Sequence, residues 1–312
     1  MRKVRLGRRV HDVAHTSGMT LMNTLVYLNG QFLSKKEAKV SIFDHGYLFG
    51  DGIFETLRSY NGTIFKLGDH MDRLFDSAKY VRMSIPVSKT DLQNLCRETL
   101  KRSSLKDAYL RITVSRGIGD RGIDPDSCKS PTLSIIVKDL PLYPEEYYIS
   151  GIPTRIVSVR KTSDESVSYR VKSCNYQNNI LARIELNQYG LIEGFILNSQ
   201  GLITEGTVSN VFIIKRGNIL TPSPACGCLE GITRNTVIEI AETELKVRVQ
   251  STQITRFEVY TADECFITNT LMEMIPVVSV DGRPIGDGSP GRMTQKLHRL
   301  FRQVANQEKQ AG

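Results

Sequence analysis

Two apolar runs near the start of the chain, residues 26–33 and 57–65, are each interrupted by an Asn-Gly pair. Both residues of such a pair tolerate positive φ, which makes Asn-Gly between apolar runs the strongest local signal for a two-residue hairpin. The chain is therefore predicted to begin with antiparallel sheet.

After residue 66 the apolar residues change to helical spacing. The positions that show it follow Asp69 and are Met71, Leu74, Phe75, Ala78 and Val81. Ser88 is a good N-cap and opens a second predicted helix, which continues to about residue 100. Two strands, 108–115 and 132–138, then complete the first half.

Residues 139–146 contain two prolines and end in two glutamates, so this segment cannot continue a strand. We interpret residues 141–150 as a linker between two domains of mixed α and β content. The expected limits are a basic extension over 1–21, a smaller domain over 22–140, a larger domain over 151–305 and a tail over 306–312.

The second half mixes strands and helices in a less regular order. The predicted elements are a strand over 154–160, a helix over 179–188, a strand meander over 194–220, a helix from Gly231 to about 245, strands over 264–269 and 275–280, and a helix from Pro290 to about 303. This pattern predicts an α+β protein.

The charge distribution argues against a nucleic-acid-binding protein. Of the net charge of +8, half lies in the first 18 residues, and the rest of the chain has no basic stripe interleaved with aromatic residues. A mildly basic body suits small anionic substrates equally well. The chain also lacks an apolar run long enough to span a bilayer.

Cysteines and histidines do not form a metal-ligating pattern. Cys226 and Cys228 are the only close pair among six scattered cysteines, and neither a second pair nor a histidine lies near them in the sequence. His45, His70 and His298 likewise have no triad-like or metal-like neighbours. We predict no metal site, and reduced thiols in a cytoplasmic protein.

The glycines of residues 117–122 match the spacing of a dinucleotide-binding fingerprint. That fingerprint requires a helix after the third glycine, but the following residues 123–131 include two prolines and cannot form a long helix. We interpret the segment as a mobile substrate loop, with a purely structural turn as the alternative.

Lys172 and Glu205 are the first candidates for chemistry. A lysine amine attacks a carbonyl only when it is unprotonated, so most lysines never act in this way and an isolated Lys172 is usually a surface residue. Together, Lys172 is a candidate Schiff-base lysine and Glu205 is a candidate carboxylate partner of the electron sink.

Three further segments have the composition of an anion site. Gly231-Ile232-Thr233 at a helix start offers N–H groups and a hydroxyl suited to a phosphate monoester, although a plain N-cap is the alternative. Residues 268–271 follow a strand and offer further hydroxyls. Arg73 offers a fixed cation, unless it is a solvated arginine on a polar helix face.

Six motifs occur together in one order over residues 26–301: 44–55, 70–78, 172–176, 204–212, 229–234 and 268–277. Taken together, they resemble those of the fold-type IV pyridoxal-phosphate enzymes, and among these the branched-chain amino acid aminotransferases. The resemblance implies a two-domain fold of the aminodeoxychorismate lyase and D-amino acid aminotransferase type. It also implies an active site between the domains, close to the subunit interface of at least a homodimer.

The resemblance implies a role for each candidate. Lys172 forms the Schiff base with pyridoxal 5'-phosphate and moves the proton at the substrate α-carbon, Glu205 faces the pyridine nitrogen, and Tyr176 bonds the ring oxygen. The phosphate contacts it implies are Arg73, Ile232, Thr233 and Thr270. The substrate contacts it implies are Phe54, Tyr109, Arg111, Thr270 and Leu271.

Tyr109 and Arg111 match the branched-chain group, where they receive the α-carboxylate and the glutamate side-chain carboxylate. This favours ping-pong exchange between a branched-chain L-amino acid and 2-oxoglutarate. A D-amino acid aminotransferase remains an alternative, but Phe54 and Ile123 replace the tyrosine and histidine that it expects. An aminodeoxychorismate lyase is a further alternative that would not need the tyrosine and arginine pair.

Overall fold

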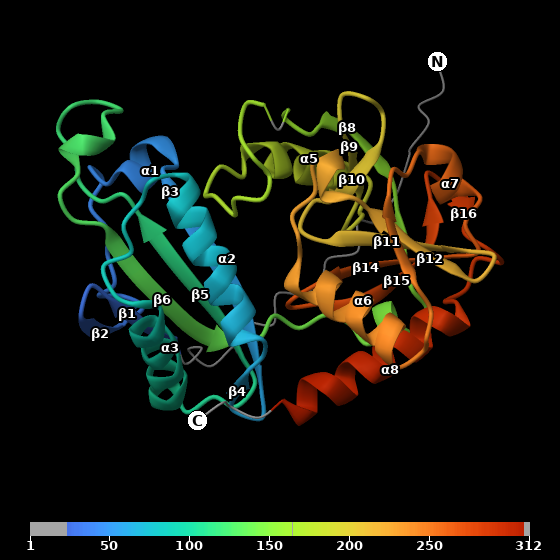
Figure 1. The fold of residues 1–312 in the computed structure, drawn as a ribbon, viewed down its shortest axis with the longest axis horizontal. Helices are drawn as coiled ribbons and strands as arrows, with labels where there is room; N and C mark the ends of the chain where they lie inside the picture. Colours follow the sequence, from blue (N-terminus) through green and yellow to red (C-terminus); the bar gives the residue numbers. More distant parts are fainter. Residues whose placement is uncertain (1–23, 164, 309–312) are drawn as a thin grey trace, which may run out of the picture.

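The computed structural model describes residues 24–163 and 165–308. The expected basic extension 1–21 and the end of the expected tail lie outside these residues. Within them, the chain forms two sheet-based units that lie side by side, with the last helix running beneath the second unit toward the first (Figure 1). No helix in these ranges combines the length and apolar content needed to cross a membrane.

The first unit is one antiparallel sheet in the order β2-β1-β6-β5-β3-β4. Its strands are β1 (Leu25–Leu28), β2 (Gln31–Ser34), β3 (Gly52–Tyr60), β4 (Thr63–Ile64), β5 (Ala108–Ser115) and β6 (Thr132–Asp139). Both predicted hairpins are confirmed. Asn29 and Gly30 connect β1 to β2, and Asn61 and Gly62 connect β3 to β4, all four with positive φ.

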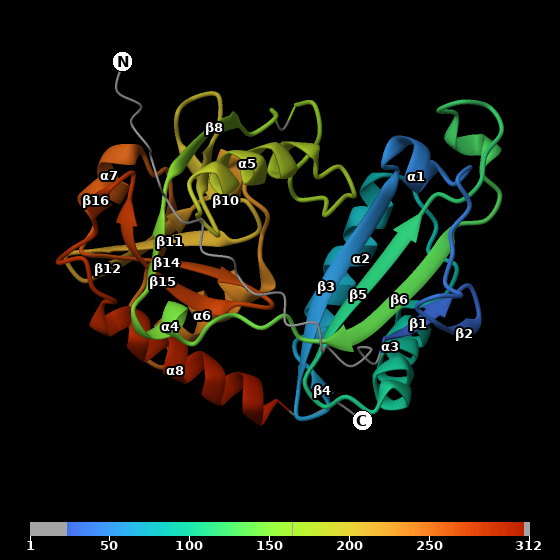
Figure 2. The same cartoon turned by 180° about the vertical axis from the view of Figure 1, so that it is seen from behind.

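Helices α2 (Leu67–Tyr80) and α3 (Lys89–Ser103) cover one face of this sheet, whereas a short α1 (His45–Phe49) lies beyond its end. Figures 1 and 2 show the strands uncovered on the other face. Ser88 caps α3 as predicted, by accepting from the Asp91 N–H. The helix α2 begins two residues before Asp69, after Lys66 in the left-handed region.

The pleat of β5 separates the core from the site. Ala108, Leu110, Ile112 and Val114 are fully buried in the core with the helices. Alternate residues of a strand point to opposite faces, so Tyr109 and Arg111 project from the other face. In β3 the same alternation places Phe54 and Thr56 on that face as well, opposite Thr113 and Arg111 of β5.

The second unit contains two sheets, in the orders β10-β9-β8 and β13-β12-β11-β14-β15-β16, with β7 paired to β15. Its strands are β7 (Ile152–Thr154), β8 (Ile156–Arg160), β9 (Phe195–Leu197), β10 (Ile203–Gly206), β11 (Asn210–Lys215), β12 (Asn218–Pro222), β13 (Val249–Thr252), β14 (Glu264–Asn269), β15 (Glu273–Val280) and β16 (Arg283–Pro284). Its helices are α4 (Glu146–Ile149), α5 (Gln177–Gln188), α6 (Ile232–Thr243), α7 (Arg256–Tyr260) and α8 (Arg292–Gln307).

The larger sheet is buried on both faces. Val211 and Ile213 of β11 pack into a core shared with the smaller sheet, whereas Phe212 and Ile214 pack beneath α6 and α8. Phe212 stacks on Phe266 of β14 with their ring centroids 4.8 Å apart. A strand buried on both faces reads as a continuous apolar run, which explains why the sequence predicted it only as part of a meander.

The predicted strand 154–160 differs from the structure, where it is two strands that belong to different sheets. The expected linker 141–150 contains the short helix α4. The last helix, α8, ends at Gln307 and not near 303, and so includes the first residues of the expected tail. Its last turn is held in place because Ala305 is buried in the core and Glu308, just after the helix, accepts from the Lys66 N–H at 2.9 Å.

Candidate active site

A cavity of about 630 Å³ is lined by residues from both units. Strands β3 and β5, helix α2, residues 161–162, residues within 167–180 and the loops around β10 and β14 all contribute side chains to it. The lining includes every residue that the sequence predicted for the site: Phe54, Arg73, Tyr109, Arg111, Lys172, Tyr176, Glu205, Ile232, Thr233, Thr270 and Leu271.

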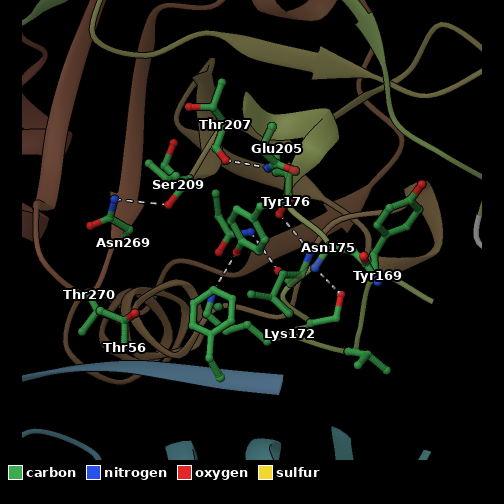
Figure 3. A pocket seen from close by; sticks show the side chains of 18 of the residues that line it. Thr56, Tyr169, Lys172, Asn175, Tyr176, Glu205, Thr207, Ser209, Asn269 and Thr270 are labelled. Atoms are coloured by element: carbon green, nitrogen blue, oxygen red, sulfur yellow. Dashed lines mark hydrogen bonds between the residues drawn. The ribbon is translucent and has the colours of Figure 1, made fainter. Parts of the chain in front are cut away.

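Lys172 lies in this cavity near Tyr176 (Figure 3), beside an edge-to-face pair of rings formed by Phe54 and Tyr176. Its Nζ donates to the Tyr176 hydroxyl at 3.0 Å and lies 4.6 Å from the centroid of the Phe54 ring. The backbone holds it there, because the Phe54 N–H donates to the Lys172 carbonyl at 2.9 Å. The amine and the phenol are thus close enough to contact the same small ligand.

Glu205 projects into the same cavity from β10 and is 8% exposed. One carboxylate oxygen accepts from the Leu229 N–H at 2.9 Å, and the other is hydrogen-bonded to the ammonium of Lys161. Sequence reasoning missed Lys161, which lies at the end of β8 with its Nζ 4.6 Å from the Tyr169 ring centroid. No spacing in the sequence links Lys161 to Glu205, which is 44 residues away.

Two lysines therefore line one cavity, and the charges around them differ. Burial alone would lower the pKa of Lys161, but the adjacent Glu205 carboxylate raises it above its usual value. Lys161 thus stays protonated and is not a nucleophile. Lys172 is hydrogen-bonded to a phenol and is the lysine available for attack on a carbonyl.

Arg73 is held rigidly by a buried carboxylate that sequence reasoning also missed. Glu55 on β3 is fully buried and accepts from Arg73 Nε at 2.7 Å and from Nη2 at 2.8 Å, while His70 Nδ1 lies 2.7 Å from the same carboxylate. Burial raises the pKa of Glu55, but Arg73 and His70 outweigh burial and lower it to about 2. The third contact of Arg73 is from Nη1 to the Glu230 carbonyl at 2.7 Å.

The start of α6 lies next to this arginine. Its N-cap is Gly231, and within the described residues no side chain caps the first turn. The N–H groups of Ile232 and Thr233 therefore remain for an anion at the positive end of the helix. In the same lining, Thr268 has a buried hydroxyl without a hydrogen-bond partner among the described residues.

The uncovered face of β5 forms another part of the lining. The Arg111 guanidinium stacks on the Phe54 ring, 3.7 Å from its centroid, and its Nε donates to Thr113 Oγ1 at 3.1 Å. Tyr109 lies two residues away on the same face. The Arg111 guanidinium also contacts the Cys174 thiol, and it lies in the lining, where a carboxylate can pair with it.

Two turns complete the lining. Asn269 Oδ1 accepts from the N–H groups of Leu271 and Met272 at 2.9 and 2.7 Å, which fixes the turn that carries Thr270. The second turn, 207–209, is held by Glu193, a fully buried carboxylate that accepts from the Thr207 N–H at 2.7 Å. Glu193 is another carboxylate that sequence reasoning missed.

The expected substrate loop 117–122 is absent from this lining. The loop instead begins against the backbone of residue 130, where only glycine fits, since a Cβ at Gly117 would lie 1.9 Å from the Ser130 carbonyl oxygen. A short 3-10 turn, Pro125–Ser127, follows in place of a long helix. Since no long helix follows Gly122 in the described chain, the dinucleotide fingerprint is ruled out, and a role of this segment as a substrate loop stays a prediction.

These residues fit pyridoxal 5'-phosphate. The helix start, Arg73 and the unpartnered Thr268 hydroxyl match a phosphate monoester, while Lys172, Tyr176 and Glu205 match an aldehyde, a ring hydroxyl and a ring nitrogen. The described residues contain no cluster of three or more histidine, cysteine or acidic side chains that would hold a metal ion.

The family model of class IV amino-transferases matches residues 52–280. The chain is 43% identical over 279 residues to a putative branched-chain-amino-acid aminotransferase of Methanocaldococcus jannaschii, covering 89% of this chain and 96% of the relative. It is also 34% identical over 280 residues to an aminodeoxychorismate lyase of Bacillus subtilis, covering 89% and 94%.

Solved structures show the same fold. The branched-chain amino acid aminotransferase of Escherichia coli superposes with a TM-score of 0.87 at 30% identity, over 92% of this chain and 97% of that one. The α+β content expected from the pattern of elements and the fold type implied by the six motifs are thereby confirmed. The chain belongs to the class IV aminotransferases.

Proposed function

We propose that this protein transfers the amino group between a branched-chain L-amino acid and 2-oxoglutarate in a ping-pong reaction. The observation that carries the proposal is the pairing of Lys172 with the Tyr176 hydroxyl in a cavity that also holds Glu205, Tyr109 and Arg111. The relative from Methanocaldococcus jannaschii is named for the same activity.

The cofactor of this class is pyridoxal 5'-phosphate. When bound, it supplies an aldehyde for the amino group and a ring that accepts the electron pair left at the substrate α-carbon. We assign the phosphate to the start of α6, Arg73 and Thr270. Glu55 keeps Arg73 in one orientation, so the ring stays fixed while amino groups exchange at its other end.

Lys172 is assigned two tasks. Its amine would hold the aldehyde of the bound cofactor and, when free, would take up the proton of the substrate α-carbon. The Tyr176 hydroxyl, 3.0 Å from Lys172 Nζ, orients this amine and would be the partner of a ring hydroxyl. The Glu205 carboxylate would favour a proton on a ring nitrogen.

Substrate selection is assigned to the uncovered face of β5 and to the turn after β14. Tyr109 and the 270–271 turn receive the α-carboxylate, and Arg111 receives the second carboxylate of glutamate. Phe54 and Leu271 offer apolar contacts to a branched side chain. One cavity can then accept both substrates, because the Arg111 guanidinium lies over the Phe54 ring, next to the apolar contacts.

An aminodeoxychorismate lyase is the second candidate, because a relative with that name covers nearly the whole chain at 34% identity. The same lysine and cofactor serve both reactions. The lyase releases pyruvate without an amino acceptor, whereas the transaminase stops after half a turnover unless a 2-oxo acid is supplied.

A donor screen tests the proposal. Purified protein with pyridoxal 5'-phosphate is offered leucine, isoleucine, valine and alanine, each as the L and the D form, with 2-oxoglutarate as acceptor. We expect the branched L-donors to react faster than alanine, and glutamate to form at one equivalent per donor consumed. Faster reaction of the D-donors, or pyruvate from aminodeoxychorismate without an acceptor, contradicts it.

We further propose that the protein is a homodimer. Phe43, Tyr47 and Leu48, on and just before α1, are 62%, 73% and 46% exposed, and Ile42 beside them is 62% exposed. An apolar group of this kind is typical of a protein interface. Sedimentation equilibrium should give twice the chain mass of 35.1 kDa, and Phe43→Glu should shift it toward the monomer. A parent that sediments as a monomer overturns this proposal.

A cytoplasmic location is supported by the cysteines. All six lie in the described part of the chain, where each is a free thiol. Free buried thiols are typical of a reducing compartment. Fractionation of the source cells tests this, since recovery of the protein with the membrane or secreted fraction counts against it.

A further inference from the structure

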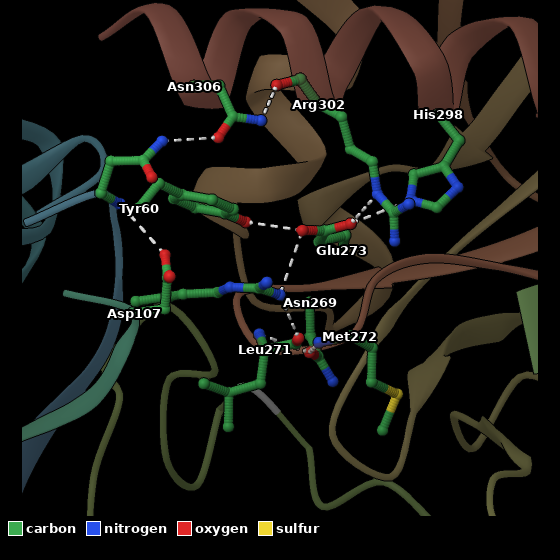
Figure 4. A network of polar contacts seen from close by, with 11 residues as sticks. Tyr60, Asp107, Asn269, Leu271, Met272, Glu273, His298, Arg302 and Asn306 are labelled. Atoms are coloured by element: carbon green, nitrogen blue, oxygen red, sulfur yellow. Dashed lines mark hydrogen bonds and ion pairs between the residues drawn. The ribbon is translucent and has the colours of Figure 1, made fainter. Parts of the chain in front are cut away.

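Glu273, the first residue of β15, lies at the centre of a polar network between the two units (Figure 4). It is 2% exposed. One carboxylate oxygen accepts from the Tyr60 hydroxyl at 3.1 Å and pairs with Arg58 at 3.1 Å, both from β3. The other accepts from Arg302 Nε at 2.8 Å and contacts His298 Nε2 at 2.9 Å, both from α8.

The network keeps this carboxylate ionised. Burial would raise the pKa of Glu273, but His298, Arg58 and Arg302 together lower it to about 2. Separating this buried anion from its partners would destabilise the folded protein, so the network holds β3 and α8 to β15 at this point.

The same network reaches the turn that lines the cavity. Arg58 Nη1, which pairs with Glu273, also donates to the Leu271 carbonyl at 2.9 Å. Glu273 has φ of +60°, a left-handed conformation that a residue other than glycine adopts at a cost. The turn from Thr270 therefore enters β15 through a strained residue whose side chain is fixed by four partners.

We propose that Glu273 is a positioning residue: through Arg58 and its own backbone it fixes the 270–271 turn, and with it the contacts to the cofactor phosphate and the substrate carboxylate. Glu273 itself is not part of the cavity lining. The inference rests on the proposed function, which assigns the phosphate contact to Thr270. It adds that the accuracy of this contact depends on a carboxylate at the junction of the two units.

The alternative is that the network only holds the protein together. The two accounts differ in what the variant loses. If the role is purely structural, the variant loses thermal stability and binds all ligands more weakly to the same extent. If Glu273 positions the turn, the variant selectively loses affinity for ligands that carry the phosphate. Pyridoxal, which has the same ring and aldehyde without the phosphate, separates these effects.

The experiment compares the Kd of pyridoxal 5'-phosphate with that of pyridoxal, measured by absorbance titration of the apoprotein. We expect Glu273→Gln to raise the Kd of pyridoxal 5'-phosphate roughly tenfold to a hundredfold, as for a misplaced contact group. The Kd of pyridoxal should stay nearly unchanged. Arg58→Met removes the link to the Leu271 carbonyl and should show the same selective loss. If Glu273→Gln does not fold, the Arg58→Met variant alone still tests the inference.

Glu264→Gln is the matched control. Glu264 on β14 accepts from the N–H groups of Met293 and Thr294 at 3.1 and 2.8 Å, so it holds the start of α8 without reaching the cavity. We expect a lower melting temperature and an unchanged ratio of the two Kd values. If the parent binds pyridoxal 5'-phosphate more tightly than pyridoxal, and Glu273→Gln and Arg58→Met keep the same ratio of the two Kd values, the inference is overturned. A parent without that preference counts against the proposed function itself.

Discussion

Replacement of Lys172 by alanine should lower turnover of the amino donor on the order of 10⁴-fold, the upper range for loss of a positioned acid-base group. The variant loses the amine that holds the aldehyde and the amine that moves the α-proton. Binding should survive, because the phosphate contacts at Arg73 and the start of α6 do not involve Lys172.

The measurement is single-turnover absorbance after mixing the cofactor-loaded variant with L-leucine, with Lys161→Arg as the control. This control changes the other cavity lysine and keeps its positive charge beside Glu205. We expect the control to retain most of its activity. If Lys172→Ala reacts as fast as the parent, or if only the Lys161 variant fails, the assignment of Lys172 is wrong.

Replacement of Glu205 by glutamine should lower kcat roughly 10²-fold to 10³-fold, as for other groups that stabilise charge in a buried site. The ring accepts electrons best when its nitrogen carries a proton, and an amide does not favour that proton as a carboxylate does. Glu230→Gln is the matched control, since Glu230 lies near the same helix start with a side chain that is 44% exposed and only loosely paired with Arg170.

A second variant separates two causes of that loss. Glu205→Gln also leaves the buried Lys161 ammonium without its carboxylate partner, which is itself destabilising. The double variant Glu205→Gln with Lys161→Met removes both charges. We expect its kcat to stay low, because the ring nitrogen still lacks a carboxylate. Recovery to parent activity would mean that Glu205 serves only to neutralise Lys161.

The local sequence pattern was sufficient to predict those elements that have a clear turn or capping residue. Asn29-Gly30 and Asn61-Gly62 fixed both hairpins, and Ser88 fixed the start of α3. The short elements α1, β13 and α7 were not predicted, since four or five residues give too little periodicity. The boundary between β7 and β8 was missed because it is set by a change of sheet, a tertiary event that the apolar pattern does not record.

The roles of the cavity residues were predictable from the resemblance to a known family. The supporting roles of Glu193, and of Glu55 and Glu273 inside two of the motifs, were not, since these carboxylates act through partners distant in the sequence. A weak signal existed for Glu55, a charged residue within the apolar strand β3 whose neighbours Ile53 and Leu57 face the core. A charge at an inward position of a strand indicates a buried partner. Lys161 carried no comparable signal.

The most direct test of the central claim is to locate the covalent attachment of the cofactor. Protein incubated with pyridoxal 5'-phosphate is reduced with borohydride, digested and mapped by mass spectrometry. The account predicts one phosphopyridoxyl group per chain, on the peptide that contains Lys172. Modification of Lys161 instead, or of surface lysines without preference, would contradict it.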